Sequence, residues 1–330
     1  MDAAVIGFSI NHARLTAELI NNSGQIPILC TINANAPTAM LVINLVLVPF
    51  ICAYSIGGNA LAAFAFCNRQ FALKCNLLAS LSVCDLLLSL FSFYLVLKYL
   101  VIFAANEWLA WLRSSIEVAI YYLGHSAKLA GDYFTLVIAT EKCCKVRLRN
   151  CKHGSKIVVI LIVLLSVLFK LPKLFEFRSI RVANCEGYAK YVVIYTKFGL
   201  NRVYAILYSV WLSALIDIFI PYCSLLVLNI LLLKRLWSNG DTVFRSSDSR
   251  ERLINVVALS CLFLICALPD FVLSIIEALE ISLLQRHFRT YTVLSDLISL
   301  SVLANSANNF TINLVFSDKL RKYRKRIICR

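Results

Sequence analysis

A single acidic residue, Asp85, stands in the middle of an apolar stretch that runs from about residue 75 to residue 97. A charge at the centre of a lipid bilayer is costly, so it indicates a function or a buried partner. Asn59 lies in an earlier apolar stretch, and Asn305 and Asn309 lie in the last one. If the helix faces that carry these four residues meet, they would form a polar core that could hold a small cation, as a sodium site does, or a proton. The same residues could instead form a buried polar contact between helices.

Further ionisable residues interrupt other apolar stretches. Lys128 and Asp132 are four residues apart and share a helix face, so they could pair with each other, or Lys128 could face a ligand cavity. Single carboxylates occur in three later stretches, at Asp217, Asp270 and Asp296. Together with Lys128 they form a candidate ligand-binding set, in which the carboxylates would line an acidic cavity for a basic ligand. Each carboxylate could equally be a contact between helices.

No pattern in the chain predicts catalysis. The four histidines are scattered, and the sequence holds no phosphate-binding loop, no Gly-x-Ser-x-Gly and no His-Glu-x-x-His. The sequence therefore predicts that the protein is not an enzyme and that it has no catalytic residues, metal site or cofactor.

Long apolar blocks, with the charges between them, are the elements that must position these residues. The chain has 330 residues, of which 60% are hydrophobic, and its mean hydropathy is +0.78. A soluble domain is typically about 45–50% apolar, and a helix needs roughly 20 mostly apolar residues to cross a bilayer. Seven blocks fit spanning helices, over about residues 39–67, 75–97, 118–140, 157–169, 203–233, 253–276 and 291–316. The sequence predicts an all-α membrane protein with a seven-helix transmembrane bundle.

The fourth block is the shortest, because residues 157–169 give only 13 uncharged residues. It reaches spanning length if Lys156, Lys170 and Lys173 extend their ammonium groups to the membrane interfaces. We therefore expect these three lysines at the edges of the bilayer.

The basic residues of the loops predict the orientation of the chain. The loops after the first, third and fifth helices and the C-terminal tail hold 20 Lys and Arg residues, against 12 on the other side. Cytoplasmic loops are enriched in these residues, so the N-terminus is expected outside the cell, with the protein in the plasma membrane. Residues 1–38 would form an extracellular segment, residues 39–317 the seven-helix domain, and residues 318–330 a cytoplasmic basic tail. The tail would begin with a short amphipathic eighth helix and be attracted to anionic membrane lipids. Nucleic acid is not an expected partner, because the basic residues flank helices.

Two features concern the expected outer face. Most of the 13 cysteines lie within helices, but Cys30 and Cys185 fall clearly outside them. They could form a disulfide or remain two unpaired thiols. Asn21, followed by Asn22 and Ser23, is an acceptor triplet for N-glycosylation in the N-terminal segment.

Several motifs resemble, in their order and spacing, the rhodopsin-like (class A) G-protein-coupled receptors over roughly residues 41–326. They are Gly58-Asn59 in the first helix, Leu81-Ser82-Val83-Cys84-Asp85-Leu86 in the second, Glu141-Lys142-Cys143 at the end of the third, Pro221 in the fifth, Cys266-Ala267-Leu268-Pro269 in the sixth, and Asn305-Ser306-Ala307-Asn308-Asn309-Phe310-Thr311-Ile312-Asn313 in the seventh. Leu171-Pro172-Lys173-Leu174-Phe175-Glu176-Phe177 is similar to the corresponding segment of invertebrate FMRFamide-like peptide receptors.

The chain also departs from the motifs of this family. Lys142 stands where the family has Arg, which keeps the charge but loses the bidentate guanidinium. Ala267 stands in place of a Trp, and Phe310 and Asn313 stand in place of a Pro and a Tyr. If the resemblance holds, these differences fit a rapidly diverging chemosensory or peptide receptor, or one with altered signalling.

The resemblance implies a receptor for a neuropeptide or another extracellular chemical signal. The ligand would bind among helices three, five, six and seven, and helix rearrangement would transmit the signal to a cytoplasmic heterotrimeric G protein near Glu141 and Lys142. Two alternatives remain open: a chemosensory receptor, and a polytopic transporter or channel. The transporter would use Asp85, Lys128 and Asp132 as its translocation path.

Overall fold

The computed structural model describes residues 42–67, 76–97, 106–143, 154–181, 191–201, 203–237, 247–279 and 288–316. Its elements, in chain order, are η1 (Ile43–Leu47), α4 (Val48–Cys67), α5 (Asn76–Val96), α7 (Glu107–Cys143), α8 (Gly154–Lys170), α9 (Lys173–Glu176), β1 (Phe177–Arg181), β2 (Tyr191–Tyr195), η6 (Tyr204–Leu212), η7 (Ala214–Phe219), α10 (Ile220–Trp237), α11 (Ser247–Leu279) and α13 (Phe288–Phe316). The three η segments are π-helical: η1 continues into α4, and η6 is followed after Ser213 by η7, which continues into α10.

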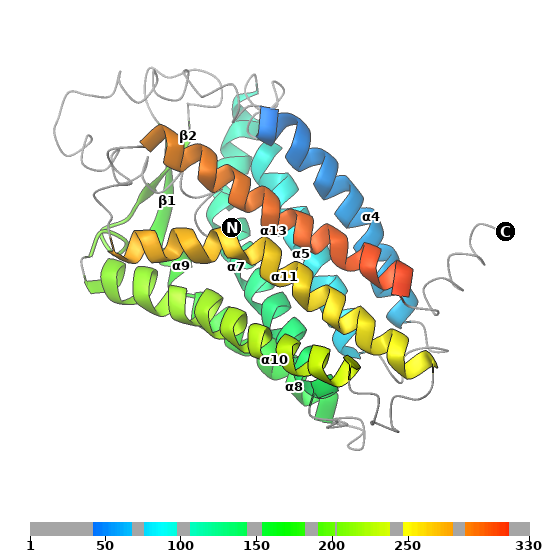
Figure 1. Cartoon of the computed structure of the whole chain (residues 1–330). Coiled ribbons are helices and arrows are strands. Elements are labelled where there is room, and N and C mark those ends of the chain that lie inside the picture. The colour runs from blue at the N-terminus through cyan, green and yellow to red at the C-terminus, as the bar shows by residue number, and fades with distance from the viewer. Residues whose placement is uncertain are drawn as a thin grey trace, which may run out of the picture.

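Seven long helical segments in these parts of the chain lie side by side as one bundle (Figure 1). α4 packs on α5, α5 on α7, and α7 on α8, while α10 packs against both α7 and α11. α13 contacts α4 and α11, which brings the last helix against the first. Each predicted apolar block is helical, so the predicted seven-helix bundle is confirmed.

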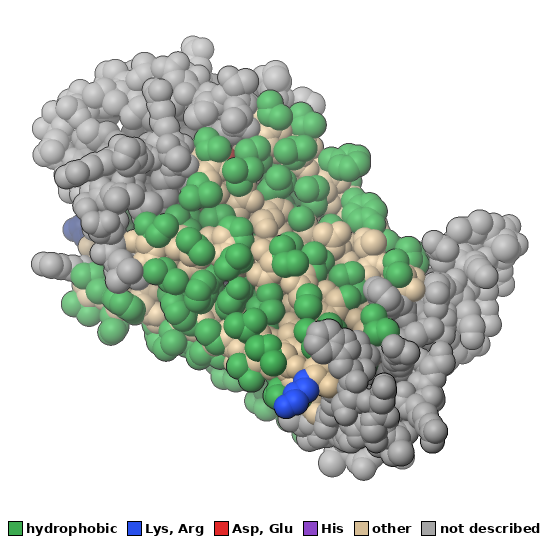
Figure 2. Space-filling view, in the orientation of Figure 1, with side chains coloured by type: hydrophobic (Ala, Val, Ile, Leu, Met, Phe, Trp, Pro, Cys, Tyr) green, Lys and Arg blue, Asp and Glu red, His purple; other side chains and the backbone are tan. Residues whose placement is uncertain are grey.

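Most of the outward-facing helix surface is apolar. Five helical segments of the described chain are long and apolar enough to cross a membrane, namely Ile43–Phe66, Leu77–Val96, Lys156–Glu176, Tyr204–Lys234 and Leu253–Leu273. Phe50, Val203 and Ile265 are each more than two thirds exposed, and Figure 2 shows hydrophobic side chains across the visible helices. Water would penalise so large an apolar surface, whereas lipid tails would not.

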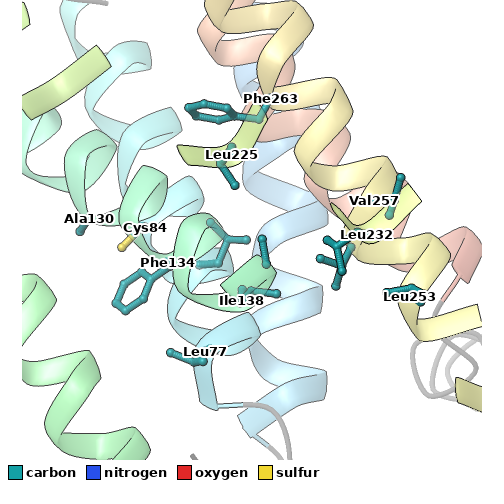
Figure 3. Close-up of a cluster of buried hydrophobic side chains, with 13 residues drawn as sticks. Leu77, Cys84, Ala130, Phe134, Ile138, Leu225, Leu232, Leu253, Val257 and Phe263 are labelled. Atoms are coloured by element: carbon teal, nitrogen blue, oxygen red, sulfur yellow. The ribbon is translucent and has the colours of Figure 1, made fainter. Parts of the chain in front are cut away.

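The main hydrophobic core joins α5, α7, α10 and α11 in one half of the bundle (Figure 3). Phe134 of α7 and Leu225 and Leu232 of α10 are fully buried there, next to Leu253 at the start of the described side chains of α11. This packing sets the positions of α7, α10 and α11 relative to one another, and α7 and α11 carry Lys128 and Asp270, two of the four candidate ligand-binding residues.

The third helix is much longer than predicted. α7 begins at Glu107, well before the predicted start near residue 118. The charged residues before residue 118 do not interrupt the helix, because Arg113 Nη1 lies 2.6 Å from Glu117 Oε2, one turn further along the same helix. Asn106 also caps the helix, since its Oδ1 accepts hydrogen bonds from the backbone N–H groups of Trp108 and Leu109.

Two of the three lysines expected at the membrane interfaces are instead buried inside the protein. Lys156 is exposed as expected, but Lys170 and Lys173 are only 1% and 3% exposed. Lys170 forms an ion pair with Asp217 of η7, and Lys173 Nζ lies 3.9 Å from Glu176 Oε2. The prediction that both would snorkel was wrong because each lysine has a carboxylate within reach.

The fifth helix is wound as a π-helix before Pro221. η6 and η7 give way to α10, in which Pro221 is the second residue. Proline has no N–H to donate and its ring collides with the preceding turn, so a wider turn before it relieves the clash. This local winding sets where Asp217 of η7 points.

A β-hairpin between the fourth and fifth helices was not predicted from the sequence. β1 and β2 are antiparallel, with Phe177 opposite Tyr195, and both rings are buried. Phe177 packs edge-on against Tyr121 of α7 at 5.4 Å between ring centroids, and Arg181 reaches Glu107 of α7 at 2.8 Å. The hairpin therefore covers the first part of α7, and we call this end of the bundle the hairpin end.

Candidate functional site

The structure brings Asp85 of α5 and Asn309 of α13 into direct contact. Asn309 Nδ2 donates a hydrogen bond to Asp85 Oδ2 at 2.9 Å, and both residues are buried. Ser306, one turn earlier on α13, donates from its Oγ to the backbone oxygen of Asp85 at 3.2 Å. The predicted proximity of the second and seventh helices at these residues therefore exists in the folded chain.

Three further polar side chains extend this contact to the first helix. Asn59 Nδ2 donates to the backbone oxygen of Ser306 at 3.1 Å and to Ser55 Oγ at 3.0 Å. Ser89 Oγ donates to Ser55 Oγ at 2.6 Å. Asn59 is thus connected to Asp85 through Ser306. We call the residues that link α4, α5 and α13 the central polar network: Ser55, Asn59, Asp85, Ser89, Ser306 and Asn309.

A second polar region, which we call the charged cavity, lies between the third, fifth, sixth and seventh helices. It is a small cavity whose polar lining comes from Lys128, Asp132, Asp217, Asp270 and Asn305. The remaining lining is apolar and includes Phe263, Cys266, Ala267 and Val302. The structure therefore gathers three of the four predicted ligand-binding residues, Lys128, Asp217 and Asp270, around one space.

Lys128 forms its ion pair across the cavity rather than along its own helix. Its Nζ lies 3.2 Å from Asp270 Oδ2 of α11, and the two side chains are 10% and 3% exposed. This ion pair ties the third helix to the sixth. Of the two interpretations of Lys128, the structure favours the one in which it faces a cavity.

Asp217 also has a lysine partner, supplied by the fourth helix. Lys170 at the end of α8 forms an ion pair with Asp217 Oδ2, and the Lys170 Nζ lies 5.3 Å from the centroid of the Phe169 ring. Sequence reasoning did not count Lys170 as a site residue. A lysine at the end of an apolar block can lie at the membrane interface or be buried in an ion pair. No local sequence signal shows that η7, which carries Asp217, lies opposite Lys170.

Of the other predicted site residues in the described chain, Asn305 lines the charged cavity, whereas Asp296 and Glu141 do not. Asp296 of α13 accepts a hydrogen bond from Asn44 Nδ2 of η1 at 3.3 Å. Asn305 lines the charged cavity and is not hydrogen-bonded to Asp85 within the described chain. Glu141 lies near the end of α7, away from the hairpin end. The side chain of Lys142 lies outside the described residues, as do Asn21, Cys30, Cys185, the N-terminal segment and the basic tail with its expected eighth helix.

Seven long helices with a lipid-compatible exterior and a buried polar interior define a multi-pass membrane protein. Its polar interior has two parts, a network between the first, second and seventh helices and a charged cavity between the third, fifth, sixth and seventh.

Comparison with characterised proteins shows the kind of receptor to which the chain is similar. It is 26% identical over 315 residues to a Caenorhabditis elegans protein described as probable G-protein coupled receptor frpr-1, covering 86% of this chain and 78% of the relative. It is 23% identical over 218 residues to the FMRFamide receptor of Drosophila melanogaster, covering 63% of this chain. The match spans only 38% of that second relative. No model of a protein family matches the chain.

The similarities and the fold support a divergent rhodopsin-like G-protein-coupled receptor. The relatives belong to a receptor family that is not enzymatic.

Proposed function

We propose that this protein is a neuropeptide receptor of the plasma membrane, which binds a short FMRFamide-like peptide outside the cell and signals to a heterotrimeric G protein inside. The observation that carries this proposal is the similarity to a receptor over 315 residues, which covers 86% of this chain. No finding favours a transporter, a channel or a chemosensory receptor.

The hairpin end of the bundle would face the outside of the cell in this proposal. The loops at the opposite end and the C-terminal tail hold 20 Lys and Arg residues, against 12 on the hairpin side. The same orientation exposes Asn21 to glycosylation and gives Cys30 and Cys185 an oxidising environment. The basic tail would then meet the anionic inner leaflet.

The ligand would bind from the hairpin end, in and above the charged cavity. Lys128, Asp132, Asp217 and Asp270 supply the charged groups of this cavity, while Asp296 of α13 accepts a hydrogen bond from Asn44 of η1. A ligand can shift the balance between two helix arrangements only if it binds one of them more tightly. The Lys128–Asp270 ion pair between α7 and α11 is a contact that such a ligand would strengthen or replace.

The signal would pass along the helices to the end that carries Glu141 and Lys142. The central polar network joins α4, α5 and α13 by hydrogen bonds that can rearrange, unlike close-packed apolar contacts. Pro221 and Pro269 give the fifth and sixth helices points at which they bend. Opening of these helices beside Glu141 would admit the G protein.

Cells that express the full chain are expected to respond to peptide amides of this class. A panel that contains Phe-Met-Arg-Phe-amide, with the same peptide as free acid, would be applied while calcium and cyclic AMP are recorded. Cells with the empty vector are the control, and surface labelling verifies that the chain reaches the membrane. If the chain is at the surface and no peptide amide of the panel changes either signal, the proposed ligand class is wrong.

Replacement of Asp85 by asparagine is expected to change the peptide response by roughly 5–150-fold in potency, the usual range of coupling between distant sites. The variant keeps the shape of the side chain but removes the charge that accepts the hydrogen bond from Asn309. Dose–response curves at matched surface expression measure the effect. Ser80→Ala on the same helix is the control, and an unchanged response in Asp85→Asn would exclude a role of the central polar network in signalling.

A further inference from the structure

A second, larger hollow lies at the hairpin end, between the first turns of α7 and strand β1, and we call it the hairpin groove. Its volume is about 690 Å³, within the range of roughly 300–1,000 Å³ that is usual for small-molecule sites. It shares no lining residue with the charged cavity among the described residues. The part of its wall that α7 supplies includes Trp111, Ser115, Val118 and Ala119.

The hairpin groove lies at the edge of the bundle, just beyond the end of the fourth helix. Tyr122 of α7 donates a hydrogen bond from its hydroxyl to the backbone oxygen of Val167 of α8 at 3.1 Å, so the two helices lie together at this level. α8 ends at Lys170, while α7 extends further toward its start, where it lines the groove. The segment that contains α8 is the least buried of the five that could cross a membrane. A molecule in the groove would therefore lie next to lipid.

Aromatic side chains place the groove at the surface of the bilayer. Trp111 lines it, and both Trp111 and Trp108 are more than half exposed. Tryptophan is enriched where a membrane meets water. From Trp111 to Ala119 the helix rises about 12 Å, whereas the headgroup region of a bilayer is roughly 5–8 Å thick on each side. The groove is long enough for a lipid headgroup and the first part of its chains.

The groove carries positive charge and one unused hydrogen-bond donor. Arg178 and Arg181 line it, and its described lining contains no carboxylate. Arg181 pairs with Glu107 at 2.8 Å, but both side chains are more than half exposed, so this ion pair is weak. Arg178 is exposed and has no ion pair among the described residues. Ser179 lines the groove with a buried Oγ that has no hydrogen-bond partner in the described chain. Two guanidinium groups beside a hydroxyl suit an anion with several oxygens, such as a phosphate.

An apolar stripe leads from the membrane-spanning surface toward the groove. Leu164, Leu168 and Leu171 are exposed and follow one another at helical spacing along α8 and the turn after it. Leu174, one turn further on, lines the groove. A water-soluble acidic ligand would gain nothing from this stripe, whereas an acyl chain that lies on it would leave the phosphate of the same lipid beside the arginines.

We propose that the hairpin groove binds one membrane phospholipid, with its phosphate at Arg178 and Arg181 and an acyl chain along the leucine stripe of α8. This site is separate from the charged cavity and goes beyond the proposed function. It requires only that the hairpin end lies at a membrane surface, on either side of the cell membrane.

Native mass spectrometry of the purified full chain in detergent tests the proposal with three probes. Dioleoylphosphatidylglycerol contains chains and phosphate, glycerophosphoglycerol has the same headgroup without chains, and dioleoylglycerol has the same chains without phosphate. We expect one phospholipid to be retained per protein, with much weaker retention of the other two probes at equal concentration. Equal retention of dioleoylglycerol would mean apolar contact only, and equal retention of glycerophosphoglycerol would indicate a soluble anion as the ligand. Either result would overturn the proposal.

Variants separate the groove from general attraction between a basic protein and an anionic lipid. Arg178→Gln combined with Arg181→Gln should weaken phospholipid binding by about tenfold or more, since hydrogen bonds to charged groups typically contribute at least this factor. Ser115→Trp narrows the groove and keeps both arginines, and it should weaken binding as well. Lys156→Gln removes an exposed cation near the other end of α8 and should leave binding unchanged.

The three changed positions are exposed, and the melting temperature of each lipid-free variant verifies that it is folded. Undiminished binding in both groove variants, or an equal loss in Lys156→Gln, would contradict the proposed site. So would the absence of any retained phospholipid in the wild type.

Discussion

Replacement of Lys170 by methionine is expected to destabilise the bundle by about 3–5 kcal/mol, the usual cost of removing one partner from a buried ion pair. Lys170 is 1% exposed and Asp217 is 3% exposed, so the carboxylate would be left in the interior without its lysine. Methionine keeps the length of the side chain, which limits the effect of lost packing. The melting temperature of the purified protein should fall by on the order of 10 °C.

A double variant tests whether the lost ion pair is the cause. Lys170→Met combined with Asp217→Leu removes both charges, and such replacements are often neutral or stabilising. It should recover most of the stability that the single variant loses. Lys156→Met, at an exposed position of the same helix, should change the stability by less than about 0.5 kcal/mol. If the double variant were as unstable as the single one, the ion pair would not account for the loss.

This ion pair matters for the site as well as for stability. It fixes the end of α8 to η7, and Asp217 of η7 forms part of the charged cavity wall. Because Lys170 forms an ion pair with Asp217, a ligand could bind this carboxylate only by competing with Lys170. A sequence that contains Asp217 and Asp270 in two separate helices does not reveal their ion pairs, since their lysine partners come from other helices.

The helices could be predicted because their signal is local. An uninterrupted run of apolar residues has to satisfy its backbone hydrogen bonds internally once it lies in lipid, and this makes it a helix whatever packs beside it. The same signal is weak where charges pair within the helix. Arg113 and Glu117 neutralise each other one turn apart, so α7 continues through a segment whose composition resembles a loop.

The β-hairpin was not predicted from the sequence for a different reason. β1 and β2 are each five residues long, and their pairing joins residues separated by the whole connecting segment. Tyr191–Tyr195 is rich in β-branched and aromatic residues, which is the signal that could have indicated a strand. What stabilises the hairpin, however, is the packing of Phe177 on Tyr121, a contact with another helix.

The candidate site was predicted in part. The proximity of Asp85 and Asn309 could be predicted because each is a rare polar group in an apolar helix, and such groups need polar partners inside the bundle. The serines of the central polar network could not be singled out, because serine also occurs alone in membrane helices and bonds to its own backbone. Asn305 was expected beside Asp85, but it lines the charged cavity, because which way a residue of α13 faces depends on how that helix is rotated.

Gly58 is expected to be intolerant of even one added methyl group. A Cβ at this position would lie 2.6 Å from Cγ of Phe310, a ring that packs among Ala62, Ala65 and Phe66. Either the ring has to leave its place or α4 and α13 have to separate. Gly58→Ala should therefore destabilise the protein by about 1–3 kcal/mol, as overpacking typically does, despite the higher helix propensity of alanine. Thermal unfolding of the purified variant measures this cost.

Gly57 provides a control on the adjoining residue of the same helix. Nothing lies within 4 Å of a Cβ at Gly57, so Gly57→Ala should be neutral or stabilising by up to about 1 kcal/mol. In a background that carries Phe310→Leu, the cost of Gly58→Ala should shrink, because the smaller side chain makes room. Gly58 adjoins Asn59 of the central polar network, and a separation of α4 from α13 would lengthen the hydrogen bond from Asn59 to Ser306. Gly58→Ala should then also change the peptide response; equal tolerance of alanine at both glycines would show that the close approach of α4 to α13 is not required.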